Sequence, residues 1–223
     1  MCGRYGFTKP EKLKAQFLTD NELVNFKPRY NIAPSQTLPV IVHENNNHIE
    51  MMRWGLIPYW AKDMSVGYKM INARAESVAE KPSYKKSLSM RRCLVPATGF
   101  IEWKTTKEGK IPFYFQLKNE DVFAFAGLFD VWHDTEGKEI RSYTIITTDA
   151  NAIVEPIHER MPVMLTKEKE RTWLDPDITE PERLLPLLTP FDAEEMKTHA
   201  ISPEINKPAN DYANLLSPVV NSK

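Results

Sequence analysis

The chain has 223 residues, of which 42% are hydrophobic, and its 29 Lys and Arg nearly balance its 30 Asp and Glu. This composition is typical of a soluble globular domain with a sizeable core. The net charge of −1 excludes a global electrostatic argument for nucleic acid, so such a partner would have to meet a local patch. No apolar run approaches the length of a membrane span, and we expect no membrane partner.

The first third of the chain alternates short elements with proline-rich connections. Residues 9–18 predict a short helix, whereas residues 28–36 are bounded by prolines and predict a loop. Residues 38–43 and 49–54 predict two strands joined as a hairpin. The next segment, 54–63, is rich in aromatic residues and proline and suits neither a helix nor a central strand.

A basic run follows at residues 81–92 and contains no acid. Most charge runs are solvated helix faces, and that is the simplest interpretation here. In a chain of nearly zero net charge, the run is also the best local candidate for a surface that faces phosphates. Its cations are Lys81, Lys85, Lys86, Arg91 and Arg92.

Strands dominate through residue 165, and helices collect at the end. This order predicts an α+β fold, a single domain with a mainly antiparallel, barrel-like β-sheet and flanking helices. No linker is long enough to divide the chain. The predicted strands are 93–103, 112–118, 122–129 and 142–150, with His158 in a short loop before another strand, and the predicted helices are 167–174, 181–188 and 192–198.

Cys2 directly follows the initiator methionine and is small enough for Met1 to be trimmed. Trimming would leave one residue with two nucleophiles, an α-amine and a thiol, whose ordinary pKa values are about 8 and 8.5. Such an aminothiol can condense with an aldehyde to an imine and then close a thiazolidine ring. It can also attack an amide. Termini are usually disordered, however, so position alone favours a residue without a special role.

Other polar residues offer candidate chemistry without selecting one reaction. The eight glycines form no phosphate loop, and the scattered cysteines and histidines have no zinc spacing, so we expect no cofactor and no metal. Cys93 opens an apolar strand and is expected to be a core thiol. Cys2 and His158 could form a thiol catalyst.

Glu102 lies between two large apolar residues, Ile101 and Trp103. Strand alternation could expose its carboxylate to solvent, which is the commoner case. Alternatively the carboxyl is buried with a raised pKa, which is what a general acid needs. The sequence leaves both possibilities open.

Six short motifs together give a more specific indication. In this order they resemble the SRAP family, the SOS-response-associated peptidases that process abasic sites, and the resemblance extends over residues 2–219. Each motif is weak alone, but six in register are a strong signal. They are Cys2-Gly3-Arg4-Tyr5, Tyr30-Asn31-Ile32-Ala33-Pro34, Trp54-Gly55-Leu56-Ile57-Pro58, Asn72-Ala73-Arg74-Ala75-Glu76, Gly99-Phe100-Ile101-Glu102-Trp103 and His158-Glu159-Arg160-Met161-Pro162.

The resemblance implies binding to single-stranded DNA, or to single-strand/duplex junctions, that carries an abasic site. The family removes Met1, by autoproteolysis or through an aminopeptidase, and links Cys2 covalently to the ring-opened sugar as a thiazolidine. Asn72 is then expected to orient the reacting terminus, and Glu102 to move protons during dehydration. His158 is expected to protonate the sugar ring oxygen. The crosslink would shield the lesion from strand cleavage, with a lyase side activity where no ring closes.

The same resemblance implies a set of DNA contacts. Arg74 matches the family's phosphate contact, and Arg4 and Arg160 are expected to add further ones. The remaining expected contacts are apolar wedges or stacking surfaces at Pro34 and Trp60 and a hydroxyl donor at Thr147.

Cys2 and Cys93 give no disulfide framework, which fits a reducing cytosol, so we expect a cytoplasmic protein that is associated with the nucleoid when it is bound to DNA. A protein that must occupy one lesion is expected to be a monomer. Replication and repair proteins would be its other partners.

Three other functions fit parts of the pattern. An N-terminal-nucleophile glutamine amidotransferase also begins Met-Cys-Gly, but it needs a synthase domain or partner that uses ammonia. A cysteine peptidase acting on other proteins would pair Cys2 with His158. A reader of modified DNA would bind without chemistry, and its binding would survive loss of the Cys2 thiol.

Overall fold

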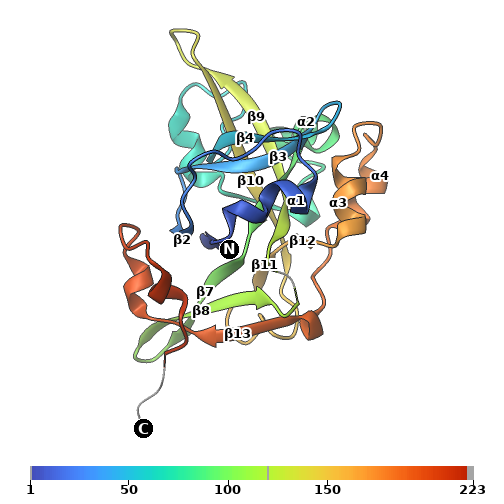
Figure 1. Ribbon diagram of the computed structural model, residues 1–223. Helices are drawn as coiled ribbons and strands as arrows, with labels where there is room; N and C mark the ends of the chain where they lie inside the picture. Colours follow the sequence, from blue (N-terminus) through green and yellow to red (C-terminus); the bar gives the residue numbers. More distant parts are fainter. Residues whose placement is uncertain (1, 120, 220–223) are drawn as a thin grey trace.

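Five strands pair into a closed barrel in the computed structural model, which describes residues 2–119 and 121–219 (Figure 1). Around the ring the order is β10, β4, β3, β6, β9 and back to β10. Every pairing is antiparallel except that of β10 with β4, which is parallel. The bounds are β3 Thr37–His43, β4 Asn47–Trp54, β6 Arg92–Ala97, β9 Phe123–His133 and β10 Glu139–Asp149.

A second, antiparallel sheet continues from the barrel in the order β13-β8-β7-β1-β2. Strand β6 ends at Ala97 and β7 begins at Gly99, so one uninterrupted stretch of chain belongs to both layers. This continuity fixes the position of β7 relative to the barrel. The bounds are β1 Arg4–Phe7, β2 Arg29–Ile32, β7 Gly99–Thr106, β8 Gly109–Leu117 and β13 Met196–Ala200.

Three short strands extend the barrel sheet at its rim. β5 (Asn72–Arg74) lies parallel to β10, and β11 (Arg160–Pro162) lies antiparallel to it. β12 (Met164–Leu165) pairs with β9. The long strand β10 therefore carries two predicted site motifs beside it, although they are far apart in the sequence.

Helices are few and short, and α3 and α4 lie together beside the barrel (Figure 1). The predicted α+β single domain with a mainly antiparallel, barrel-like sheet is confirmed. No helix in the described part of the chain combines the length and the apolar character that a membrane crossing requires. The helices are α1 Leu13–Phe17, α2 Pro82–Met90, α3 Lys167–Leu174 and α4 Pro181–Leu184.

Two predictions of local structure are wrong. Residues 28–36 do not form only a loop, because they contain strand β2 between the flanking prolines. β2 is an edge strand, where nearby prolines are tolerated. Residues 192–198 do not form a helix: Asp192 caps a short 3₁₀ turn, and the chain then enters edge strand β13.

The predicted helix at 181–188 is only partly helical. α4 ends at Leu184 and continues as the 3₁₀ turn Leu185–Leu187. Pro186 has no backbone N–H and therefore cannot extend the α-helical hydrogen bonding.

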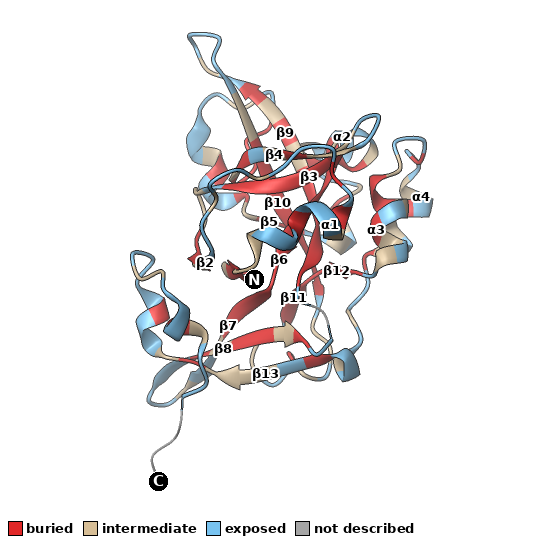
Figure 2. Ribbon diagram, in the orientation of Figure 1, coloured by how far each residue is buried: buried red, intermediate tan, exposed pale blue. Residues whose placement is uncertain are grey.

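The core fills the barrel with aromatic and branched side chains, and Figure 2 shows its strands as mostly buried. Tyr5 of β1 and Tyr143 of β10 place their hydroxyl groups 2.8 Å apart in this core. The ring of Trp54 lies edge-on to Tyr5 and stacks parallel to Tyr143. These contacts of Tyr5 join the second sheet to the barrel through β1.

Cys93 is fully buried, as predicted for a core thiol.

Helix α2 covers Pro82–Met90 of the basic run 81–92, but the run is not one solvated face. Lys81 and Lys85 are exposed, whereas Arg91 pairs with Asp130. Arg92 is buried and donates hydrogen bonds to four backbone carbonyl groups, those of Leu88, Ser89, Trp173 and Asp175. Its guanidinium therefore joins α2 to α3 and does not face phosphates.

Replacing Arg92 with methionine should destabilise the protein by about 2–3 kcal/mol, because buried carbonyl groups lose a charged donor. Urea unfolding of Arg92→Met and of the exposed control Lys85→Met measures this difference. The control should stay within about 0.5 kcal/mol of the wild type. Equal unfolding midpoints for the two variants would contradict the role of Arg92 as a joint between helices.

Candidate functional site

The pairing of β1 with β7 brings Cys2 and Glu102 to the same end of the second sheet. Arg4 is directly opposite Ile101 in the antiparallel register. Cys2 lies two residues before Arg4, and Glu102 lies one residue after Ile101. Both side chains are buried, with exposed fractions of 0% and 3%.

Strand β10 positions the other two predicted catalytic residues. Asn72 begins β5, opposite Ile145, and its side-chain amide donates to the Ile145 carbonyl at 3.4 Å. His158 lies two residues before β11, whose Arg160 pairs with Asp149. The barrel thus brings His158 to Glu102, with 4.0 Å between His158 Nε2 and Glu102 Oε2.

The carboxyl group of Glu102 is in the protonated state that a general acid needs. Burial raises the pKa of its carboxyl from the ordinary value of 4.5 to about 8. The carboxyl therefore retains its proton at neutral pH. Of the two possibilities that strand alternation left open, the structure shows the buried one.

His158 is held through its other ring nitrogen. Nδ1 lies 3.0 Å from the backbone nitrogen of Arg160, which donates to it, and 3.2 Å from the carbonyl oxygen of the same residue. A neutral ring accepts the first bond, and a protonated ring donates the second, so Nδ1 has a partner in either state. Burial lowers the pKa of His158. Where these two side chains meet, the protonated Glu102 can release a proton and the neutral His158 can accept one.

The thiol of Cys2 is in its unreactive form. Burial raises the pKa of Cys2, and the neighbouring Glu102 adds to this effect. The thiol lies 3.7 Å from the Arg4 carbonyl oxygen, to which it can donate. While Met1 precedes Cys2 in the chain, the Cys2 nitrogen is an amide, so loss of Met1 is required for an aminothiol.

A cavity of about 480 Å³ opens beside the Glu102 and His158 pair, within the usual size range of ligand sites. Sequence reasoning did not predict its other lining residues. Thr105 and Lys110 are opposite each other in the β7–β8 hairpin, and Asn206 comes from the end of the chain. These residues become neighbours only through the register of β7 with β8 and through the return of the C-terminal segment, so no local sequence pattern could identify them. The lining residues are Glu102, Trp103, Thr105, Lys110, His158 and Asn206.

The three predicted phosphate contacts have different surroundings. Arg74 is exposed on β5. Arg160 is buried and forms ion pairs with Glu76 and Asp149, each at 2.6 Å. Arg4 donates hydrogen bonds to other parts of the chain. Arg74 is therefore the arginine of this set that is most open to a ligand.

The remaining predicted DNA contacts also differ. Trp60 is 52% exposed and can stack on a ligand, and Pro34 is half-buried. Thr147 is fully buried, and its hydroxyl donates to the Ala73 carbonyl at 3.4 Å. Its predicted donation to a DNA backbone therefore finds no support in this structure.

One group of potential metal ligands occurs within the described residues, Glu44, His48 and Glu50. Glu50 already accepts hydrogen bonds from Arg141 at 2.6 and 2.7 Å, and it pairs with His48 at 3.0 Å. The Arg141 cation neutralises the Glu50 carboxylate. The group is therefore explained as an ion-pair network on the barrel surface.

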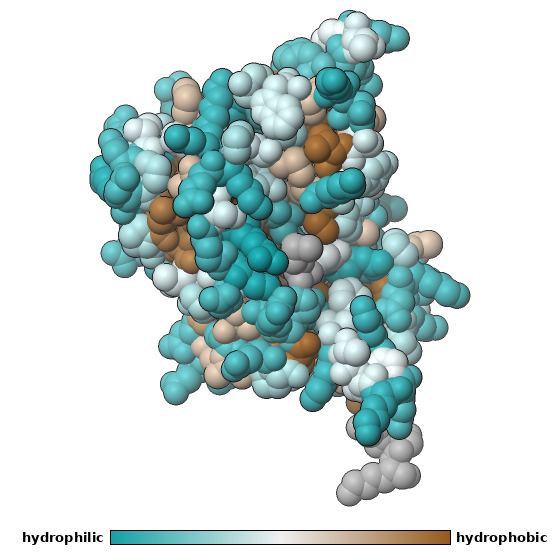
Figure 3. Space-filling model, turned by 180° about the vertical axis from the view of Figure 1, so that it is seen from behind, coloured by the Kyte–Doolittle hydropathy of each residue, from teal (hydrophilic) through white to brown (hydrophobic). Residues whose placement is uncertain are grey.

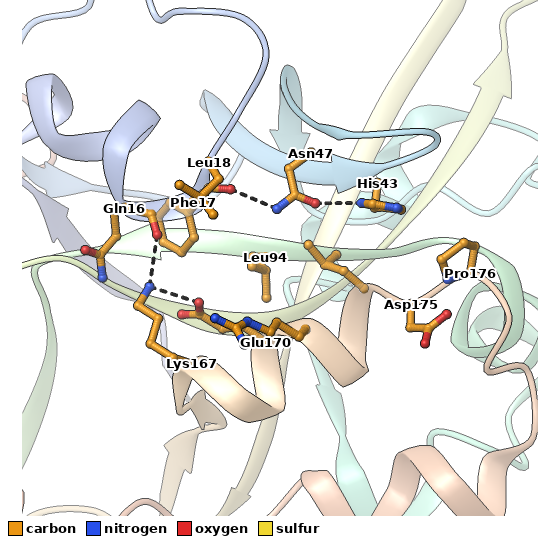
Figure 4. A pocket seen from close by; sticks show the side chains of 12 residues that line it. Gln16, Phe17, Leu18, His43, Asn47, Leu94, Lys167, Glu170, Asp175 and Pro176 are labelled. Carbon is orange, nitrogen blue, oxygen red and sulfur yellow. Dashed lines mark hydrogen bonds and ion pairs between the residues drawn. The ribbon is translucent and has the colours of Figure 1, made fainter.

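A second cavity, of about 340 Å³, lies between α1, the β3–β4 hairpin and α3 and contains none of the predicted site residues (Figure 4). Lys167 lines this cavity and donates to Gln16 O and Glu170.

On the opposite side of the molecule from Figure 1, the surface is mostly hydrophilic, with hydrophobic residues in separate small groups (Figure 3).

The raised pKa of Glu102 makes stability depend on pH. Between pH 4.5 and about 8 the native carboxyl holds a proton that the unfolded chain has lost, so stability falls as pH rises through this window. Glu102→Gln removes this dependence. Its unfolding free energy relative to wild type should increase from pH 5 to pH 8 by at least about 1.4 kcal/mol, the equivalent of one pKa unit.

Denaturant unfolding at both pH values measures this change, with the exposed Glu194→Gln as control. A constant difference between Glu102→Gln and wild type would mean that Glu102 titrates normally.

Known proteins are similar to this chain in sequence and in fold. The family model described as SOS response associated peptidase (SRAP) matches residues 1–208. The abasic site processing protein YoqW of Bacillus subtilis (strain 168) is 46% identical over 221 residues, covering 97% of this chain and 99% of that protein.

A second protein of that strain, abasic site processing protein YobE, is 45% identical over 213 residues, covering 93% of this chain and 97% of its own. A crystal structure of a protein from Bacteroides thetaiotaomicron superposes with a TM-score of 0.90 at 30% identity, covering 98% of this chain and 100% of that one. On this evidence the chain belongs to the SRAP family.

Proposed function

We propose that this protein processes abasic sites in DNA by forming a covalent thiazolidine crosslink through Cys2. The observation that carries the proposal is the buried, protonated Glu102, which lies 4.0 Å from His158 at the end of the sheet where Cys2 precedes β1. The names of the similar Bacillus proteins support the same lesion as substrate.

The chemistry begins with hydrolytic loss of Met1, which frees the Cys2 amine. An abasic sugar opens to an aldehyde, and the amine adds to its carbonyl carbon to give a carbinolamine. Protonated Glu102 donates to the carbinolamine hydroxyl, which leaves as water and gives a protonated imine, and the N–H proton then returns to the Glu102 carboxylate to leave the neutral imine. The Cys2 sulfur then adds to the imine carbon, and the thiol proton moves to nitrogen. The product is protein plus DNA minus one water.

His158 acts at a different step of the proposed reaction. Nε2 lies at the Glu102 carboxyl, and Nδ1 has a hydrogen-bond partner in either protonation state. We assign it proton transfer to the sugar ring oxygen during opening. Because burial lowers its pKa, the neutral ring prevails at neutral pH, so Glu102 supplies the proton that His158 passes to the ring oxygen. The proton of the anomeric hydroxyl goes to the Glu102 carboxylate as the aldehyde forms, so Glu102 is protonated again for the dehydration step.

Single-stranded DNA, or a single-strand/duplex junction, is the proposed partner, and the protein acts on it as a monomer. A missing base offers nothing to read, so recognition relies on the aldehyde and the backbone. Exposed Arg74 supplies a phosphate contact and exposed Trp60 a stacking surface. Asn72 orients the new N-terminus.

Cys2→Ala should abolish the denaturation-resistant adduct with abasic single-stranded DNA, because no thiol closes the ring. Its α-amine should still form an imine that borohydride traps. Intact-mass spectrometry before and after incubation distinguishes these species. A stable adduct of the alanine variant at wild-type yield would exclude the thiol's role. Wild-type protein that has lost Met1 but forms no adduct would favour the amidotransferase or peptidase, which glutamine and peptide substrates then test.

Arg74→Gln should weaken binding to single-stranded DNA and reduce the slope of log K against log salt by about 0.7, the value for one phosphate contact. Binding is measured with an oligonucleotide carrying a tetrahydrofuran spacer, which has no aldehyde. Arg171→Gln, an exposed position on α3, should leave the slope unchanged. Equal slopes for both variants would remove Arg74 from the DNA interface.

A further inference from the structure

The end of the chain returns to its beginning. Residues 203–217, here called the C-terminal strap, follow β13 and contain the two 3₁₀ turns Pro203–Asn206 and Ala213–Leu216. Figure 1 shows this segment beside β7 and β8, away from α3 and α4. The strap therefore belongs to the layer that carries Cys2 and Glu102.

A small hydrophobic cluster anchors the strap. Ile205 and Leu215 are fully buried, and they pack with Ile101 of β7 and Tyr114 of β8 in a group separate from the main core. Ile101 directly precedes Glu102. The strap is thus held against the strand that carries the proposed acid.

Asn31 of β2 joins the strap to the sheet through polar contacts. Its side chain is fully buried, and Nδ2 lies 2.8–3.1 Å from the carbonyl oxygens of Ile205, Lys207 and Asn210. Its Oδ1 accepts from Arg4 Nη1. The amide orientation follows from these partners, because a reversed group would face donors with its NH₂ and carbonyls with its oxygen.

Arg4 completes the connection. Besides Asn31, it donates to Ile205 O at 2.8 Å and to Asn206 O at 3.2 Å. The carbonyl oxygen of Arg4 is in turn 3.7 Å from the Cys2 sulfur. A continuous set of bonds therefore leads from the strap through Asn31 and Arg4 to the reacting residue.

Two further contacts tie the strap to the same site. The Asp211 carboxylate accepts from the backbone nitrogens of Tyr30 and Asn31 at 2.6 and 3.1 Å and pairs with Arg29. Asn206 lines the cavity beside Glu102, and its Oδ1 accepts from the Trp103 indole at 2.7 Å.

We infer that Asn31 is a positioning residue for Cys2 and acts through Arg4 and the C-terminal strap. This inference rests on the proposed crosslinking reaction. Asn31 does not touch substrate; it fixes the path of β1, and β1 sets where the Cys2 amine and thiol meet the aldehyde. Arg4 has the same role, in place of the phosphate contact expected from the sequence.

Asn31→Asp tests the inference, because it preserves size and the bond from Arg4 but places a carboxylate against three carbonyl oxygens. The rate of adduct formation at saturating abasic oligonucleotide should fall about ten- to a hundredfold, as expected when reacting groups are misplaced. The Kd for an oligonucleotide with a tetrahydrofuran spacer should stay at the wild-type value. An unchanged rate, or a rate and affinity that fall together, would overturn the inference.

Tyr212→Phe is the matched control within the strap. It removes only the exposed hydrogen bond from Tyr212 to Glu204, 2.6 Å long, and should react at the wild-type rate. Arg4→Lys separates the two roles of Arg4: lysine keeps the charge but lacks the rigid planar fork whose two nitrogens reach the three acceptors, so a positioning role predicts a slower reaction with an unchanged salt slope. A reduced salt slope with an unchanged rate would restore the phosphate contact.

Hydrogen exchange provides a readout that does not depend on the reaction. In Asn31→Asp the amides of β1 should exchange faster than in wild type, while those of β9 should not change. Unchanged protection of β1 would overturn the inference even if wild-type protein forms no adduct and the proposed function itself fails. Should Asn31→Asp not fold, Asp211→Asn is measured in the same way, with the same expected results.

Discussion

The antiparallel pairing of β1 with β7 is the constraint on which the site depends. Arg4 opposite Ile101 places the first residues of the chain against a strand that is continuous with the barrel wall. Termini usually fray, yet here Cys2 is fully buried. The same pairing removes Glu102 from water, and this burial gives its carboxyl the pKa of an acid that is still protonated at neutral pH. The pairing of β1 with β7 is therefore the cause of both the buried position of Cys2 and the protonated state of Glu102.

The barrel supplies the other half of the site. β10 pairs with β5 and β11 on its two sides, so it holds Asn72 on one side and, on the other, the segment that brings His158 to within 4.0 Å of Glu102. Each of the two sheets thus contributes one pair of the predicted catalytic residues, and the Tyr5–Tyr143 contact in the core that they share holds the sheets together. Movement of one layer against the other would separate Glu102 from His158.

Sequence patterns predicted the fold class and most strands because apolar alternation is strong from residue 38 to residue 150. The edge strands β2 and β13 were missed because each is short, has one paired neighbour, and lies beside proline or acidic residues typical of loops and helices. The site residues came from the motif order. The buried states of Thr147, Arg92 and Arg160 depend on contacts between distant elements, which no local pattern contains.

The tie between the two ends of the chain has a consequence for protein synthesis. Cys2 leaves the ribosome well before the strap, because it precedes residues 203–217 in the chain. The hydrogen bonds from Arg4 and Asn31 to residues 205–210 cannot form until that segment has been translated. A nascent chain that still lacks the strap therefore carries Cys2 without the contacts that fix the path of its strand.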